Sequence, residues 1–298
     1  MVLCSFKEKR MPQLASRCLP RRPRSMARLR PGAAGLLGLC GALLSVPAGA
    51  ADFWDLDWLV GTAGEPATVT LGVGGILRPD YEGARHMGVD PVPVIEIDKL
   101  FHGRLFLSTV DGVGVNLLSE GPLKLKAAVN YSGGRDSGDN DRLRGLDDIE
   151  GAAVVSAKLS YDLDPVTTTL DVTHRFGSDS GTQFVLGAAY GFSPIRDLKL
   201  SLGGRVSFAD GRYQNAFFGV GDREAARATA LGNPMTAYKA EGGFHDVGLK
   251  LSGTYSLSDS WLLSGAVGAT LLVGDAADSP LTERKLQPTA YLGLAYRF

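Results

Sequence analysis

Apolar and polar residues alternate along most of the sequence from residue 66 onward. In the stretch 153–163, every second residue is apolar, and Ser156, Lys158 and Asp162 stand between the apolar ones. A period of two is typical of a β-strand whose two faces meet different environments. Twelve strands are predicted on this basis, at residues 66–77, 91–98, 103–110, 112–118, 122–132, 150–163, 166–176, 182–192, 197–208, 242–256, 260–273 and 287–298. The stretch 222–231 is the exception and is predicted to form a short helix.

The connections between these strands alternate in length. Links after even-numbered strands are short, whereas four links after odd-numbered strands are long, at 78–90, 133–149, 209–241 and 274–286. This alternation is typical of an antiparallel up-and-down barrel in the bacterial outer membrane, with short periplasmic turns and long outside loops. An even number of strands places both chain ends in the periplasm. Ten strands is the alternative count.

The size and charge of the two strand faces favour a membrane barrel over a soluble sandwich or lipocalin-like barrel. Many strands reach ten residues, the length that a tilted strand needs to cross a bilayer. The apolar face is too large for one core, so we expect it to face lipid and the charged face to line the lumen. Basic residues expected to point into the lumen are Lys124, Lys126, Lys158, Arg175, Lys199, Arg205, Lys250 and Arg297; the acidic ones are Glu96, Asp98, Asp162 and Asp171.

These lumen charges allow two interpretations. An open lumen with an excess of basic residues predicts a preference for anions, because the lining charges of a pore set its selectivity. Alternatively, the charges pair with one another and fill a narrow barrel. Twelve strands leave limited room, which favours the closed or very narrow lumen.

The first fifty residues are predicted to direct export. Residues 26–50 combine a basic start, the apolar run 35–46 and a small-residue cleavage site before Ala51, the three parts of a secretory signal. Residues 1–25 do not fit such a signal and form a probable upstream extension. All three cysteines lie in this part of the chain, at Cys4, Cys18 and Cys40. A mature chain from Ala51 therefore contains no thiol.

The remaining chain is acidic. Nine of the 31 basic residues and one of the 32 acidic residues lie within residues 1–50, which leaves 22 basic against 31 acidic residues. A chain with this balance is a poor ligand for a nucleic-acid backbone.

The C-terminal strand carries a more specific pattern. Apolar residues recur at steps of two and finish on an aromatic residue at the chain end: Leu292, Leu294, Tyr296 and Phe298. This pattern resembles the signal that the outer-membrane barrel-insertion machinery recognises.

Four stretches of the sequence also resemble a known family. They are 72–83 (GVGGILRPDYEG), 217–220 (FFGV), 272–282 (LVGDAADSPLT) and 293–298 (GLAYRF). The chain resembles the MipA/OmpV family, the MltA-interacting proteins of Gram-negative outer membranes, over about residues 66–298. The resemblance implies an outer-membrane protein, which in some members is a scaffold for a murein lytic transglycosylase and a peptidoglycan synthase. Other members look like osmotic-response or adhesion proteins.

The motif residues are predicted to lie in the outside loops. They are Pro79, Tyr81, Gly83, Phe217, Phe218, Gly219, Gly274, Asp275, Asp278, Ser279 and Pro280. The turn-forming residues of 274–280 favour a loop folded over the barrel mouth rather than a ligand site. We expect Phe217 and Phe218 to pack as a plug or lid rather than to form an exposed adhesive patch. The acidic stretch 134–150 lacks calcium-loop spacing and is expected to be a solvated loop.

Nothing in the sequence predicts an enzyme, a metal site or a cofactor. No spacing marks a nucleophile and base pair, and His/Cys clusters typical of zinc are missing from the sequence. His86 and His245 are expected near the outside rim, where loop aspartates are in reach.

The segment 51–65 carries aromatic residues among acidic ones. Phe53, Trp54 and Trp58 suit binding to a partner, although an aromatic belt or a strap folded into the lumen fits equally well. The leading function is a non-enzymatic scaffold for peptidoglycan-remodelling enzymes. The alternatives are a narrow anion-preferring channel or osmotic-response porin, and a surface adhesin using loop 209–241.

Overall fold

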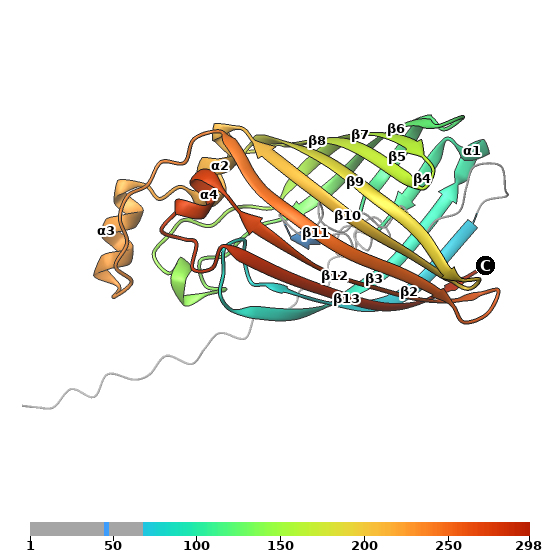
Figure 1. The fold of residues 1–298 in the computed structure, drawn as a ribbon. Helices are drawn as coiled ribbons and strands as arrows, with labels where there is room; N and C mark the ends of the chain where they lie inside the picture. The colour runs from blue at the N-terminus through green and yellow to red at the C-terminus, as the bar shows by residue number, and fades with distance from the viewer. Residues whose placement is uncertain (1–44, 48–67) are drawn as a thin grey trace, which may run out of the picture. The chain divides into compact units, whose positions relative to one another are not determined.

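Twelve antiparallel strands form a closed β-barrel in the computed structural model, which describes residues 45–47 and 68–298 (Figure 1). Each strand pairs with its neighbours in the sequence, and β13 (Leu286–Arg297) pairs with β2 (Thr68–Pro79) to close the ring. The other strands of the barrel are β3 (Met87–Lys99), β4 (Leu105–Ser108), β5 (Gly112–Leu118), β6 (Leu123–Gly133), β7 (Ala152–Leu163), β8 (Val166–Arg175), β9 (Gly181–Ile195), β10 (Leu198–Ala209), β11 (Gly243–Ser256) and β12 (Trp261–Leu272). The predicted all-β, up-and-down, twelve-stranded architecture is confirmed.

Short helices lie between the strands. They are α1 (Leu100–Gly103), the 3-10 turn η3 (Asp141–Leu143), α2 (Gly211–Phe218), α3 (Asp222–Ala230) and α4 (Gly274–Asp278). Helix α3 confirms the helix predicted at 222–231. No helix among the described residues is long and apolar enough to cross a lipid bilayer.

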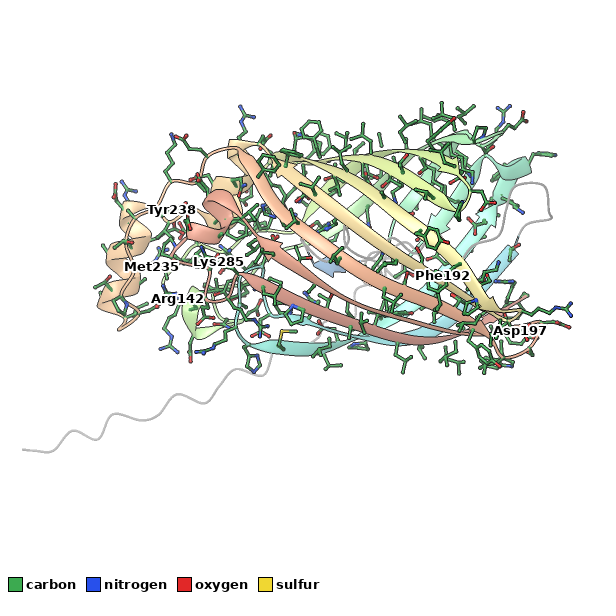
Figure 2. All side chains as sticks on the ribbon, in the orientation of Figure 1. Arg142, Phe192, Asp197, Met235, Tyr238 and Lys285 are labelled. Carbon is green, nitrogen blue, oxygen red and sulfur yellow. The ribbon has the colours of Figure 1, made fainter. Side chains whose placement is uncertain are left out.

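The two ends of the barrel differ, and we call them the turn end and the loop end. The turn end carries the links 100–104, 119–122, 164–165, 196–197 and 257–260. The loop end carries the links 80–86, 109–111, 134–151, 176–180, 210–242 and 273–285. In Figure 2, Phe192 and Asp197 mark the turn end, and Arg142, Met235, Tyr238 and Lys285 mark the loop end. The first long link is shorter than the predicted 78–90, because β3 already begins at Met87 and because Pro79, predicted to lie in the loop, ends β2.

The outer face of the barrel is apolar. Side chains of every second residue project from it, among them Val73, Leu249 and Leu292, while residues such as Ser252 and Thr254 face inward and are buried. Exposed aromatic residues gather toward the turn end at Tyr190, Phe192, Tyr255, Trp261 and Phe298, and toward the loop end at Tyr131, Phe176, Phe184 and Phe244. An apolar band between two aromatic girdles is the outer surface of a membrane barrel.

A three-residue strand, β1 (Ser45–Pro47), is not one of the twelve strands of this ring. It runs parallel to the end of β6, with Ser45 opposite Tyr131 and Pro47 opposite Gly133. The rest of the predicted extension and signal peptide, 1–44 and 48–50, lies outside the described residues.

A charge on the apolar band should weaken the barrel according to its depth. Leu249 lies in the middle of β11 and is 67% exposed, so Leu249→Arg should cost about 2–4 kcal/mol of the free energy of unfolding. Leu257, beside the turn end and 52% exposed, is the control, and Leu257→Arg should cost about 0–1 kcal/mol. Equilibrium unfolding from lipid vesicles measures both, and equal costs would contradict a membrane-embedded band.

Candidate functional site: a cap of motif loops at the mouth of the barrel

The long loops at the loop end pack against one another and form a cap. One apolar cluster draws its buried residues from four separate loops: Tyr81, Ala84, Leu143, Leu146, Val220, Ala225, Ala228, Met235 and Leu281. Apolar side chains that are brought together from loops 80–86, 134–151, 210–242 and 273–285 leave water jointly, so each loop stabilises the others. The cap therefore has a core of its own.

Helices α2 and α4 build a second cluster of the cap next to the barrel wall. It contains Ile149, Ala209, Tyr213, Phe217, Phe218, Ala240, Leu272, Ala276 and Ala277. Helix α2 begins at this point because Asp210 caps it, its Oδ1 accepting a hydrogen bond from the Tyr213 amide at 2.8 Å. The helix ends at Gly219, whose amide donates to the Asn215 carbonyl at 2.9 Å.

The first motif, around Tyr81 and Gly83, ties loop 80–86 to loop 273–285. The Tyr81 hydroxyl donates to the Leu281 carbonyl at 2.9 Å, and the Gly83 carbonyl accepts from the Glu283 amide at 2.9 Å. Gly83 has φ +100°, and a side chain there would press on Thr282, so this position requires glycine. Burial and the nearby Glu283 carboxylate raise the pKa of the Tyr81 hydroxyl well above its usual range, and the hydroxyl remains a donor at physiological pH.

The second motif fastens α4 to its surroundings. Gly274 has φ +54° and lies under the Phe244 carbonyl, where a side chain would clash. The Asp275 side chain accepts from the Glu241 amide at 2.6 Å, and its carbonyl accepts from the Tyr238 hydroxyl at 3.0 Å. Helix α4 thus holds the C-terminal end of loop 210–242.

The end of the same motif connects to the remaining loops. The Ser279 hydroxyl donates to the Phe218 carbonyl at 2.6 Å, and the Pro280 carbonyl accepts from Arg142 Nε at 3.0 Å. Asp278 is exposed and pairs with Lys285 Nζ at 3.0 Å. The family-motif residues from three distant parts of the sequence therefore meet in one structure.

The predictions for these loops have different outcomes. Residues 274–280 pack into the cap through Ala276 and Ala277, and Phe217 and Phe218 are buried in the cap rather than exposed. The prediction of a solvated loop at 134–150 is wrong for its apolar residues, because Leu143, Leu146 and Ile149 are buried in the two clusters. The acidic residues of 134–150 outnumber the apolar ones, so the sequence pattern gave no sign that the apolar residues belong to a core.

A buried polar cluster lies beneath the cap. His245 and Asp246 on β11 are both fully buried, and His245 Nε2 lies 2.7 Å from Oε1 of Glu82 in loop 80–86. Arg205 Nη2 on β10 lies 3.1 Å from Asp246 Oδ1, and the Ser207 hydroxyl donates to Asp246 Oδ2 at 2.5 Å. With the imidazole protonated, two cations face two carboxylates. The cluster links the cap loop to the barrel wall.

This cluster has the residue types of a metal site but the geometry of an ion-pair network. Ligand atoms of Glu82, His245 and Asp246 lie within 4.8 Å of one another. However, the Arg205 guanidinium against Asp246 repels a metal ion at the same place. Within the described residues, this cluster is therefore a network of ion pairs rather than a metal site.

A β-bulge explains why sequence reasoning missed the cluster. The pairing of β10 with β11 shifts between Ser207 and Phe208, so that His245 has no direct partner. A bulge inserts one residue and lets two consecutive side chains point to the same side. The expectation that His245 lies near the rim was right, but its acidic partner is Glu82. His86 does meet a loop aspartate, at 2.9 Å from Asp80.

The charged inner face of the barrel contains ion pairs. Lys124 Nζ lies 2.7 Å from Asp162, and Lys158 Nζ lies 3.8 Å from Asp111 and 3.7 Å from Asp171. Among the other predicted lumen cations, Lys126 Nζ lies 5.4 Å from the centre of the Phe106 ring, and Arg175 Cζ lies 5.6 Å from the centre of the Phe217 ring. Lys250 lies on the inward side of β11, opposite Gly203 of β10.

The C-terminal strand closes the ring. Leu292, Leu294 and Phe298 are exposed on the outer face, and the Phe298 amide donates to the Val69 carbonyl at 2.9 Å. The Tyr296 ring lies 5.2 Å from that of Trp261. The alternation predicted for this strand is confirmed. That the barrel-insertion machinery recognises the strand stays a prediction. Phe53, Trp54 and Trp58, the predicted partner-binding residues, lie outside the described residues.

The family model of MltA-interacting protein MipA matches residues 71–298. This range covers the whole barrel apart from the first three residues of β2. The chain belongs to this family. The MipA-family chain is an outer-membrane β-barrel, as its sequence resemblance implies. Comparison with curated proteins yields no match.

Several solved outer-membrane proteins are similar to this MipA-family barrel. Vibrio cholerae OmpT with loop L8 deleted shares 8% identity over 78% of this chain and 98% of that chain, with a TM-score of 0.37. The outer membrane channel DcaP of Acinetobacter baumannii shares 10% identity over 80% of this chain and 100% of that chain, with a TM-score of 0.33. Similarity this distant carries no argument about function, and the fold assignment rests on the strand pairing described above.

The apolar core of the cap should depend on Phe218. This side chain is fully buried, so Phe218→Ala should cost the cap about 3–5 kcal/mol. Leu231, which is 53% exposed, supplies the control, and Leu231→Ala should change stability by less than about 0.5 kcal/mol. Limited proteolysis of the loops in the reconstituted barrel measures the difference. Equal cleavage rates in the two variants would refute a packed cap.

The polar cluster beneath the cap should depend on Asp246. Asp246→Asn leaves the Arg205 guanidinium without its carboxylate, which should cost about 3–5 kcal/mol. Asp278→Asn makes the same change in the exposed pair with Lys285 and should cost about 0–1 kcal/mol. The free energy of unfolding is the measurement. A loss for Asp246→Asn no larger than that for Asp278→Asn would show that the cluster contributes little.

Proposed function

We propose that this MipA-family barrel is a non-enzymatic scaffold for peptidoglycan-remodelling enzymes, a lytic transglycosylase and a peptidoglycan synthase. The family's description as MltA-interacting protein carries the proposal. The chain reaches its site of action after export by the signal at 26–50 and insertion by the barrel-insertion machinery. The loop end then faces outward, and the turn end faces the periplasm, where murein enzymes work.

The segment 51–65 is the main contact for these enzymes. The turns at the turn end are short, with only two residues at 164–165 and at 196–197. Strand β2, which follows this segment in the sequence, begins at Thr68, opposite Asp98 at the turn end. Phe53, Trp54 and Trp58 supply the aromatic anchors on which protein interfaces typically depend.

The loop end supports this proposal over a channel. The cap packs loops from four parts of the chain across the mouth, and ion pairs bring lumen cations to carboxylates. A diffusion channel works best with an open mouth and accessible lining charges. The adhesin alternative is also weakened, since Phe217 and Phe218 are buried in the cap and offer no exposed apolar patch.

The test removes the aromatic anchors without touching the barrel. The double variant Trp54→Ala, Trp58→Ala should lose most of the lytic transglycosylase that the parent protein captures from cross-linked envelopes, about tenfold or more if these residues are hot spots. Trp261→Ala removes an exposed tryptophan from the barrel wall and should capture as the parent does. Mass spectrometry quantifies the captured enzymes against other abundant barrels.

Two results would contradict the proposal. Capture of neither enzyme by the parent protein would reject the scaffold itself. Full capture by the double variant would reject segment 51–65 as the contact.

A further inference from the structure

The wall of the barrel is interrupted on one side, toward the loop end. The β4–β5 hairpin is short, and β3 pairs with β4 only at Glu96 and Ile97. On the other side of the hairpin, the pairing of β5 with β6 ends at Val113 and Val129. Among the described residues, no strand of the barrel therefore lies between Met87–Val94 of β3 and Asn130–Gly133 of β6, and only the short strand β1 pairs with the end of β6. We call this interruption the β3–β6 gap.

Two prolines remove hydrogen-bond donors from the β3 edge of the gap at the positions nearest the hairpin. The Ile95 amide donates to Thr109 Oγ1 of the hairpin at 2.8 Å, which shows that this amide faces the gap side. Residues at steps of two along a strand face the same way. The next two are Pro93 and Pro91, which have no N–H to leave unsatisfied in hydrocarbon. Proline is thus placed where the wall lacks a neighbour.

The β6 edge and the floor of the gap are fastened by side chains. The Tyr131 amide donates to the Asn130 side chain at 2.8 Å, and Asn130 Nδ2 donates to the Val110 carbonyl at 2.5 Å. The Thr109 amide donates to the Ile95 carbonyl at 2.9 Å. These bonds fix the hairpin turn at the foot of the gap. The interruption is therefore a defined feature of the wall.

Apolar residues border the gap on both faces of the wall. On the outer face, Val89 is 72% exposed, and Val129 and Tyr131 are exposed on the opposite edge. On the inner face, Val92 packs against a cluster formed by Ile76, Val94, Ala266, Tyr291 and Ala295. This cluster is an apolar patch on an inner wall that otherwise carries many charges. The gap therefore joins two apolar surfaces.

We propose that the β3–β6 gap is a lateral opening that admits the acyl chain of a membrane lipid to the apolar inner wall. The prolines disfavour an added protein strand on β3, which would need backbone donors. The apolar border disfavours a polar solute. The cap covers the axial entrance, so the side of the barrel is the route that an apolar chain in the bilayer meets.

Strand β1 lies at this opening in the full chain. Ser45–Pro47 pair with Tyr131–Gly133, along the β6 edge. These residues belong to the segment 26–50, which the sequence predicts to be removed on export. Their removal would leave the β6 edge of the opening free for a lipid chain.

The test uses photolabelling of the protein purified from membranes and reconstituted in phosphatidylcholine vesicles. A fraction of the lipid carries a diazirine in the middle of one acyl chain, and mass spectrometry locates the label. Val92 and Val94 should carry severalfold more label than Val185, an inward valine on β9 where both neighbouring strands are paired along its length. Val89, on the outer face, is the positive control.

Two results would overturn the proposal. Label at Val92 and Val94 no higher than at Val185, with Val89 labelled, means that acyl chains do not enter. A second arm replaces the labelled lipid by a fatty acid with the same diazirine. Inner labelling from the fatty acid but not from the phospholipid would reject a membrane lipid as the ligand. Neither arm depends on the proposed scaffold role.

Discussion

Closure of the hydrogen-bonded ladder is the constraint on which the structure depends. In hydrocarbon, an unsatisfied backbone amide or carbonyl costs several kcal/mol, so strands cross a membrane only in a ring. Here β13 completes the ring by pairing with β12 on one side and β2 on the other. The apolar outer face and the charged inner face follow from that closure, since alternate side chains must point to opposite sides of the wall. Where the ladder is interrupted, Pro91 and Pro93 remove two of the donors that a neighbouring strand would have satisfied.

The cap is stabilised in a different way from the barrel wall. Its loops lie beyond the bilayer and must bury apolar side chains against one another. Loops from four parts of the chain share two apolar clusters, and the family motifs supply the turns and hydrogen bonds that hold them together. The cap is joined to the wall through Glu82 of the loops and His245 of β11. Membership of the MipA family thus has a structural meaning here: the motif residues hold the long loops together in one cap. Such a cap fits the proposed scaffold, which acts through its periplasmic side, more than a channel that passes solutes.

The barrel could be predicted from the sequence, whereas the cap could be predicted only in part. Alternation located all twelve strands because a two-faced wall imposes a period of two on every one of them. The same rule failed at His245 and Asp246, where a bulge turns both side chains inward, and a bulge depends on the pairing of two strands rather than on one sequence. Leu143 and Leu146 were assigned to a solvated loop because their neighbours are acidic. Their burial depends on Ala228 and Leu281, far away in the chain, and local patterns carry no information about such contacts.

Amide hydrogen exchange of the reconstituted barrel tests the central claim, that the motif loops form an ordered, closed cap, most directly. Peptides covering 211–230 and 274–283 should exchange far more slowly than the turn 119–122, because their amides are held in helices and in bonds between loops. Exchange in these cap peptides as fast as in the turn would mean that the loops do not hold together. The mouth would then be open, and the case for a sealed scaffold over a channel would be lost.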